Sequence, residues 1–185
     1  MIRKMLIANR GEIAVRVIRA CREMGIETVA VYSTADKECL HVQLADHAVC
    51  IGPPPSSKSY LNKDALITAA LCTGCDAVHP GVGFLSENAD FAREVEKSGM
   101  FWIGPKPDTI EMLGDKVRAR ETAQKSGLPI TPGSAGAITT KEQAVETANK
   151  CGYPIIIKAA SGGGGKGMRI VWKEADLAEN LAIAS

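Results

Sequence analysis

Aromatic side chains and net charge are both scarce in this chain. Aromatic residues make up 4% of its 185 residues, and 22 Lys and Arg residues are offset by 21 Asp and Glu residues, which leaves a formal net charge of +1. Single-stranded nucleic acids are commonly bound on aromatic rings, and an excess of positive charge attracts nucleic acids and anionic membranes. We therefore expect no nucleic acid and no membrane as a partner, and any anion site must be local.

A secretory apolar segment is also missing. The first residues, MIRKMLIAN, lack the roughly 7–15-residue apolar stretch of a signal peptide. The six cysteines mostly fall within apolar helix or strand patterns, so we expect reduced thiols in a cytoplasmic protein. Cys72 and Cys75 have C-x-x-C spacing, but no second pair completes a zinc site. Buried packing is the more usual role of such free cysteines.

The dinucleotide-binding fingerprint is absent. The turn that follows the first apolar run, 8–14, holds one glycine, Gly11, where the pattern G-x-G-x-x-G has three. A nicotinamide-dependent dehydrogenase is therefore not expected. Gly11 is interpreted as the residue that turns the chain into the next helix.

Strands and helices of similar length alternate through the first hundred residues. Apolar runs predict strands at 5–9, 27–33, 48–51, 77–79 and 101–103, and helical spacing predicts helices at 13–24, 60–72 and 89–97. Such alternation is typical of a parallel sheet with right-handed crossovers. The fold class is therefore α/β, and its first domain, 1–113, is expected to be Rossmann-like.

A second domain is expected from residue 114 onward. Gly114 ends one predicted helix (108–113), and Asp115 can cap the next (116–126). Further predicted elements are a helix at 141–151, a hairpin within 153–172 and a helix at 174–185. The apolar pattern of the last helix runs to the final residue, so we expect 114–185 to be the start of an α+β domain that is cut short.

A run of glycines lies between two lysines inside the predicted hairpin. Lys158 ends its first strand, and Gly162, Gly163, Gly164, Gly165, Lys166 and Gly167 follow. Adjacent N–H groups without Cβ atoms form a concave anion site, to which lysines add charge, so the pattern favours phosphate over a simple linker turn. It is not a Walker A loop, because position 160 is Ala160 and Gly167 follows the lysine.

Several motifs, in order along the whole chain, resemble those of the biotin carboxylases. They are IANRGEIA (7–14), HPGVGFLSEN (79–88), FWIGP (101–105), GDK (114–116) and KAASGGGGKGMR (158–169). The resemblance implies a pre-ATP-grasp domain followed by an ATP-grasp domain with a glycine-rich flap. It also implies an ATP-dependent ligase that forms carboxyphosphate from bicarbonate and carboxylates carrier-bound biotin.

The resemblance also implies cofactors, partners and site residues. ATP and Mg²⁺ would be used, and the partners would be a biotin carboxyl carrier protein or domain, a carboxyltransferase component and a second copy of the enzyme. Nucleotide contacts are carried over to Lys116, Lys158, Gly162, Gly163, Gly164, Gly165, Lys166 and Gly167. Substrate contacts are carried over to His79, Gly83 and Glu87, beside Val82 where the family usually has tyrosine.

In the family, the Mg²⁺ carboxylates, the general base and the bicarbonate-binding and biotin-binding arginines come after the point where this chain ends. No metal ligands and no complete catalytic set are therefore expected within it, and the chain alone is expected to be inactive. Two alternatives remain open at this point. One is a different ATP-grasp ligase, and the other is a non-catalytic nucleotide-binding or interaction module.

Overall fold

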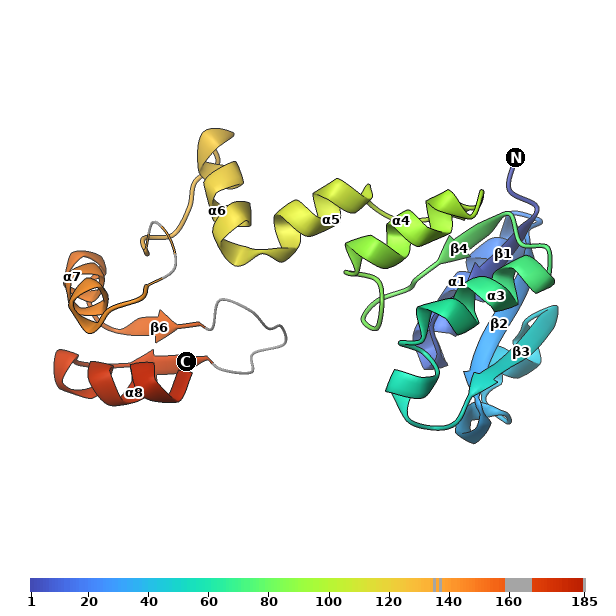
Figure 1. The fold of residues 1–185 in the computed structure, drawn as a ribbon, viewed down its shortest axis with the longest axis horizontal. Helices are drawn as coiled ribbons and strands as arrows, with labels where there is room; N and C mark the ends of the chain where they lie inside the picture. The colour runs from blue at the N-terminus through green and yellow to red at the C-terminus, as the bar shows by residue number, and fades with distance from the viewer. Residues whose placement is uncertain (135, 137, 159–167, 185) are drawn as a thin grey trace. The chain divides into compact units, whose positions relative to one another are not determined.

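The computed structural model describes residues 1–134, 136, 138–158 and 168–184, and it divides into two compact units, Met1–Glu111 and Met112–Ser185 (Figure 1). Within the described residues no helix is long and apolar enough to cross a membrane.

The first unit is built on a five-stranded parallel sheet with strand order β3-β2-β1-β4-β5. The strands are β1 (Lys4–Ile7), β2 (Glu27–Ser33), β3 (His47–Gly52), β4 (Ala77–His79) and β5 (Phe101–Trp102). The helices are α1 (Gly11–Glu23), α2 (Leu40–Leu44), α3 (Lys63–Cys72), α4 (Ala89–Lys97) and α5 (Pro107–Gly114), the last of which spans the boundary between the units. The expected α/β fold class is confirmed.

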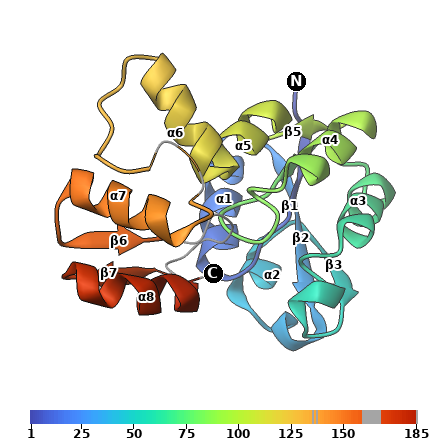
Figure 2. The ribbon, with the colours of Figure 1, turned by 60° about the vertical axis from the view of Figure 1, so that its left-hand side comes forward.

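Helices cover both faces of the sheet because side chains on a strand alternate between the faces. Leu6 and Val29 belong to the large core that also holds residues of α3 and α4, whereas Ile7 packs with Ala14 and Ile18 of α1. In Figure 2, α1 and α3 lie on opposite sides of the strands. Strands buried on both faces are near-continuously apolar, as in a doubly wound sheet.

The direction of strand addition reverses between β1 and β4. The chain leaves β1 through α1 to reach β2 on one side, and it later returns to place β4 on the other side, where Ile7 pairs with His79. In open α/β sheets, ligands bind outside the carboxyl ends of the strands at such a switch point. The loops that follow Ile7 and His79 therefore occupy the position where a site is expected.

Several predicted element bounds differ from the observed ones, and one helix was not predicted. The helix expected from residue 60 begins at Lys63, because the Asn62 side chain accepts a hydrogen bond from the N–H of Ala65 (3.1 Å) and caps it there. Tyr60 is instead a core residue, 2% exposed. The polar connection after the strand 27–33 contains the short helix α2, which was not predicted, and the last helix begins only after a 3₁₀ turn at Glu174–Asp176.

The second unit is a helix–hairpin–helix arrangement. Its elements are α6 (Lys116–Lys125), α7 (Lys141–Cys151), the antiparallel strands β6 (Ile155–Ile157) and β7 (Arg169–Val171), and α8 (Leu177–Ala184). The Asp115 carboxylate accepts hydrogen bonds from the N–H groups of Val117 and Arg118, both at 2.9 Å, so the predicted cap is confirmed. A small core holds Ala148, Val171 and Leu177.

His41 of α2 is fully buried in the first unit. Its Nε2 lies 3.3 Å from the carbonyl oxygen of Val31, and its Nδ1 has no hydrogen-bond partner among the described residues. Burial lowers the pKa of His41, while the Val31 carbonyl and Asp36 oppose that shift and Arg10 adds to it. The ring is therefore held neutral in the folded protein.

We predict that His41 makes the first unit less stable in mild acid. Because the unfolded chain binds the His41 proton more readily, stability is full above the ordinary histidine pKa of about 6.5 and falls below it, by at most about 1.4 kcal/mol per pH unit. His41→Gln should flatten this dependence. Unfolding by urea is followed through Trp102 in a Trp172→Phe background, and identical slopes for both chains would contradict the prediction.

Candidate functional site

Asn9 joins the two loops at the switch point. Its side chain is nearly buried, and Nδ2 donates to the carbonyl oxygens of Pro80 (2.8 Å) and Val82 (2.9 Å). Its Oδ1 accepts from the N–H of Arg10 at 2.9 Å. The Asn9 amide group thus donates both of these hydrogen bonds. They hold together residues that are 71 and 73 positions apart in sequence.

Asp36 is the charged centre of the same region. The Nε of Arg10 donates to its carboxylate at 3.0 Å, and a second, very short bond comes from Nη2 of the same guanidinium. Ser33 Oγ (2.8 Å) and the Tyr60 hydroxyl (2.7 Å) also donate to Asp36 Oδ2. Hydrogen bonds from Arg10 above all, and then from Tyr60 and Ser33, hold the pKa of Asp36 well below its usual range.

Tyr60 contacts both Asp36 and the loop after β4. Burial and its hydrogen bond to Asp36 raise the pKa of Tyr60 to about 12, so the hydroxyl stays protonated as a donor. Its ring stacks on that of Phe84, with centroids 5.0 Å apart and planes inclined by 19°. Phe84 has a φ of +44°, a left-handed conformation that is rare for a bulky residue.

Two of the three predicted substrate residues, Gly83 and Glu87, lie in this loop, and the third, His79, is the last residue of β4. His79 Nδ1 accepts a hydrogen bond from the N–H of Gly81 at 3.0 Å, which leaves Nε2 to carry the proton of the neutral ring, and burial lowers the His79 pKa. Gly83 has a φ of +75° beside the exposed Val82. Glu87 is exposed in the turn before α4.

The predicted nucleotide residues lie in the second unit. Lys158 is exposed directly after β6, and Lys116 is the first residue of α6. Gly162, Gly163, Gly164, Gly165, Lys166 and Gly167 lie outside the described residues. Their proposed role as a flap therefore stays a prediction.

One face of the hairpin is apolar and exposed. Ile156 pairs with Ile170 across the strands, and these side chains are 55% and 56% exposed. The two-residue alternation of strands puts Lys158 and Met168 on the same face, one step toward the glycine run. Ile155 and Val171 face the core instead. The structure thus sets an apolar surface beside a lysine.

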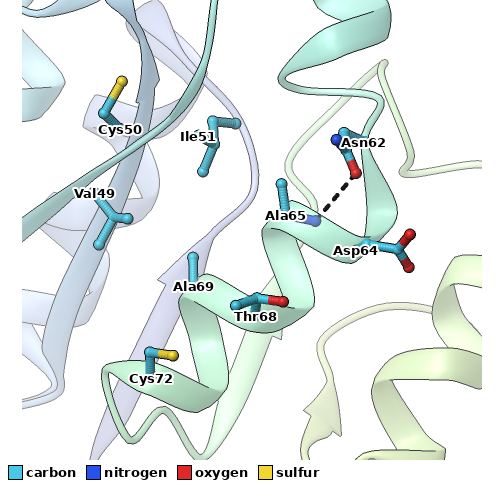
Figure 3. Close-up of a pocket in the computed structure, with 9 residues that line it drawn as sticks. All are labelled: Val49, Cys50, Ile51, Asn62, Asp64, Ala65, Thr68, Ala69 and Cys72. Atoms are coloured by element: carbon cyan, nitrogen blue, oxygen red, sulfur yellow. Dashed lines mark hydrogen bonds between the residues drawn. The ribbon is translucent and has the colours of Figure 1, made fainter.

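A separate groove of about 520 Å³ lies between the edge strand β3 and helix α3 (Figure 3). Its lining residues are Val49, Cys50, Ile51, Asn62, Asp64, Ala65, Thr68, Ala69 and Cys72. The only charged residue among them is Asp64, so the groove is unsuited to a phosphate or a carboxylate. It also lies at the β3 edge, two strands from the switch point.

Two observations bear on metals and thiols. Among the described residues, no group of three or more His, Cys, Asp or Glu side chains is arranged to hold a metal ion. All six cysteines are free, as expected, and of the C-x-x-C pair Cys75 is buried while Cys72 is exposed. The packing role predicted for the pair thus fits Cys75 only.

Sequence reasoning did not find Asn9, Asp36, Tyr60 or the apolar hairpin face. Asp36 lies in a polar connection, where acidic residues are usually solvated, and Tyr60 falls next to a proline-rich loop. The hairpin face does have a signal: in the strand 155–157 every residue is apolar, although a two-stranded hairpin on a core buries only one face. An apolar residue on the other face therefore points to a ligand or partner.

Comparison with known proteins identifies an α/β chain that pairs a pre-ATP-grasp domain with an ATP-binding domain. Residues 1–110 match the family described as biotin carboxylase, N-terminal domain, and residues 115–185 match the carbamoyl-phosphate synthase L chain, ATP binding domain. The chain belongs to the biotin carboxylase family.

Sequence similarity to curated relatives extends over nearly the whole chain. Biotin carboxylase 1 of Bacillus subtilis is 58% identical over 183 residues, which cover 99% of this chain and 41% of that protein. The biotin carboxylase of Haemophilus influenzae is 57% identical over 186 residues, with the same coverage. The chain thus spans about two fifths of the length of the curated relatives it matches.

Solved structures agree with this assignment. A biotin carboxylase–β,γ-ATP complex from Campylobacter jejuni has a TM-score of 0.95 and 46% identity, covering 100% of this chain and 41% of that one. The biotin carboxylase domain dimer of Hydrogenobacter thermophilus 2-oxoglutarate carboxylase, with MgADP, ADP and bicarbonate, has a TM-score of 0.93 and 47% identity. It covers 100% of this chain and 40% of its own.

We predict that Asp36→Asn lowers the free energy of unfolding of the first unit by about 1–3 kcal/mol, because Arg10 loses its counter-ion and the buried donors lose a charged acceptor. Glu94→Gln is the matched control. Glu94 forms only a partly exposed pair with Lys63 at 3.6 Å, so less than about 1 kcal/mol should be lost. Urea unfolding measures both, and equal losses would remove Asp36 from its central role.

Proposed function

We propose that this chain supplies the nucleotide-binding hairpin and the substrate-facing loop of an ATP-dependent biotin carboxylase. In that reaction ATP phosphorylates bicarbonate, and carboxyphosphate then provides the carboxyl group for the ureido nitrogen of carrier-bound biotin. Within this proposal, 1–113 form the Rossmann-like domain and 114–185 begin the ATP-grasp domain. The supporting family membership is that of biotin carboxylases.

The observation that carries the proposal is the exposed hairpin face. Ile156, Ile170 and Met168 offer an apolar surface for a purine ring, and Lys158, next on the same face, offers a positive charge for the phosphates attached to it. Lys116 is proposed as a second nucleotide contact, and the segment Gly162–Gly167 as the flap over the phosphates. Because phosphoryl transfer needs mainly positioning and charge neutralisation, these residues act electrostatically.

The loop after β4 is proposed to face bicarbonate and biotin. Neutral His79 can donate a hydrogen bond from Nε2, and Gly83 brings its backbone close to a ligand without a Cβ. Glu87, exposed in the turn before α4, is proposed as a third contact. Mg²⁺ would accompany ATP, and the described residues offer it no ligand cluster.

The proposed macromolecular partners are a biotin carboxyl carrier protein or domain, a carboxyltransferase component and a second copy of the enzyme. Relatives differ in the final acceptor that their names state. They include the propionyl-CoA carboxylase alpha chain of Ruegeria pomeroyi and the pyruvate carboxylase of Rhizobium etli. The proposal therefore covers an acyl-CoA or a 2-oxo acid as the final acceptor.

A different ATP-grasp ligase is the second candidate, because residues 115–185 match an ATP-binding domain described from carbamoyl-phosphate synthase. It would use the same hairpin face and Lys158. It would not require the His79–Asn88 loop, and phosphorylation of an acceptor other than bicarbonate would favour it.

The proposal is tested in a chimera, in which this chain replaces the matching 41% of Bacillus subtilis biotin carboxylase 1. The chimera should release ADP only when bicarbonate and biotin are both present. The 185-residue chain alone should release none. An inactive but folded chimera would contradict the proposed function, as would turnover by the chain alone that Lys158→Ala abolishes.

We predict that Lys158→Ala lowers kcat/KM for ATP in the chimera by about 10- to 100-fold, because a charge-assisted contact worth about 1.5–3 kcal/mol is lost. Lys150→Ala is the control. Lys150 lies in the same unit but forms an exposed pair with Glu146 on α7, so its removal should change kcat/KM less than about twofold. An unchanged value for Lys158→Ala would remove Lys158 from the site.

A further inference from the structure

The Asn9 side chain holds the first half of the loop that follows β4. Asn9 Nδ2 donates both of its hydrogens, to the carbonyl oxygens of Pro80 and Val82. Asn9 is only 3% exposed, so water cannot readily replace these bonds. The carbonyl groups on both sides of Gly81 are thereby turned toward the same amide.

Gly81 fits closely over that amide. A Cβ atom at Gly81 would lie 2.6 Å from Asn9 Nδ2 and 2.8 Å from Asn9 Cγ, which is closer than real Cβ contacts allow. Gly81 also has a φ of +68°. The loop can therefore close onto Asn9 only with glycine at this position.

The second half of the loop is held by Tyr60. The stacked ring of Phe84 belongs to a residue with a φ of +44°, a strained conformation that persists only where the surroundings enforce it. Tyr60 is itself fixed by Asp36 and by the N–H of Ser33, which donates to its hydroxyl at 2.9 Å. Between the two anchors, Val82 remains 71% exposed.

We propose that Asn9 and Tyr60 are positioning residues that hold the loop 80–85 in the strained form in which Gly83 meets the substrate. This inference rests on the proposed function, since it assigns the loop to the bicarbonate and biotin side. Both residues are buried, with Asn9 3% and Tyr60 2% exposed, and we assign them no contact with the reacting groups. They act through the loop, because strain concentrated in one segment and enforced from two sides is how a site is kept preorganised before its ligand arrives.

The first test is amide hydrogen exchange on the 185-residue chain. The N–H of Ser86 is bonded to the Gly83 carbonyl oxygen (2.9 Å) and that of Gly81 to His79 Nδ1, so both report on the loop. Asn9→Ala should speed exchange at these two amides at least tenfold, while the β1 amides stay unchanged. Asn62→Ala removes an amide that caps α3 and serves as the matched control, with no change expected in the loop.

A second variant reaches the same contact from the loop side. Gly81→Ala should displace Asn9 and reproduce the faster exchange at Ser86. Gly25→Ala is its control, because Gly25 has nearly the same φ (+69°) but nothing within 4 Å of the added Cβ. If Asn9→Ala does not fold, hydrogen exchange is measured on Asn9→Ser and on Tyr60→Leu in its place. Each of these variants removes only part of the contacts that hold the loop. Unchanged exchange in the folded variants would overturn the inference.

The third test is kinetic and uses the chimera with Bacillus subtilis biotin carboxylase 1. Asn9→Ala and Tyr60→Leu should raise KM for bicarbonate or biotin at least tenfold and leave KM for ATP within twofold. Tyr60→Phe, which keeps the stacking ring, should recover most of the loss. A merely structural role would reduce the active fraction without this split in KM.

The two proposals fail in different ways. An inactive parent chimera contradicts the proposed function, yet hydrogen exchange still decides whether Asn9 holds the loop. An active chimera whose Asn9→Ala variant keeps its KM for bicarbonate and biotin contradicts the positioning role and leaves the proposed function intact.

Discussion

The buried carboxylate of Asp36 is the constraint on which the switch-point region depends. A carboxylate taken out of water must be paired and fully hydrogen-bonded, and here one guanidinium and two hydroxyl groups meet that demand. Its donors come from the turn after β1, from the end of β2 and from the segment before α3. Three segments that are distant in sequence are thereby hydrogen-bonded to one carboxylate, and the loop after β4 contacts the same group of residues because Phe84 stacks on the Tyr60 ring.

Much of the fold could be predicted because the local patterns agree with one another. The strand 77–79 and the helices 89–97 and 141–151 are found at their predicted bounds, since each is closed by glycine, proline or a capping residue. The error at residue 60 has a tertiary cause. Tyr60 is helix-compatible in isolation, but burying its ring beside Asp36 outweighs one more turn of α3.

The candidate site could be predicted only where it follows motifs. His79, Gly83 and Lys158 were proposed from motifs that resemble those of the biotin carboxylases, and the structure puts them at a strand end or in a loop of positive φ. Asn9 and Asp36 were missed because their roles arise from partners distant in sequence. No periodicity in a single chain reports that an amide will face a loop 71 residues later. The hairpin face was missed for a different reason: the three consecutive isoleucines indicate an apolar residue on each face of the strand, but the sequence does not tell which face is exposed, and the structure shows that it is the face of Ile156.

The close fit between Gly81 and Asn9 has a consequence for sequence variation. Any larger residue at position 81 would need a smaller one at position 9, and a smaller residue there would give up both carbonyl contacts. Substitutions at positions 9 and 81 therefore depend on each other. In chains that keep this loop, each should be inherited with the other, and an exchange at one of them should mark a loop that has changed its path.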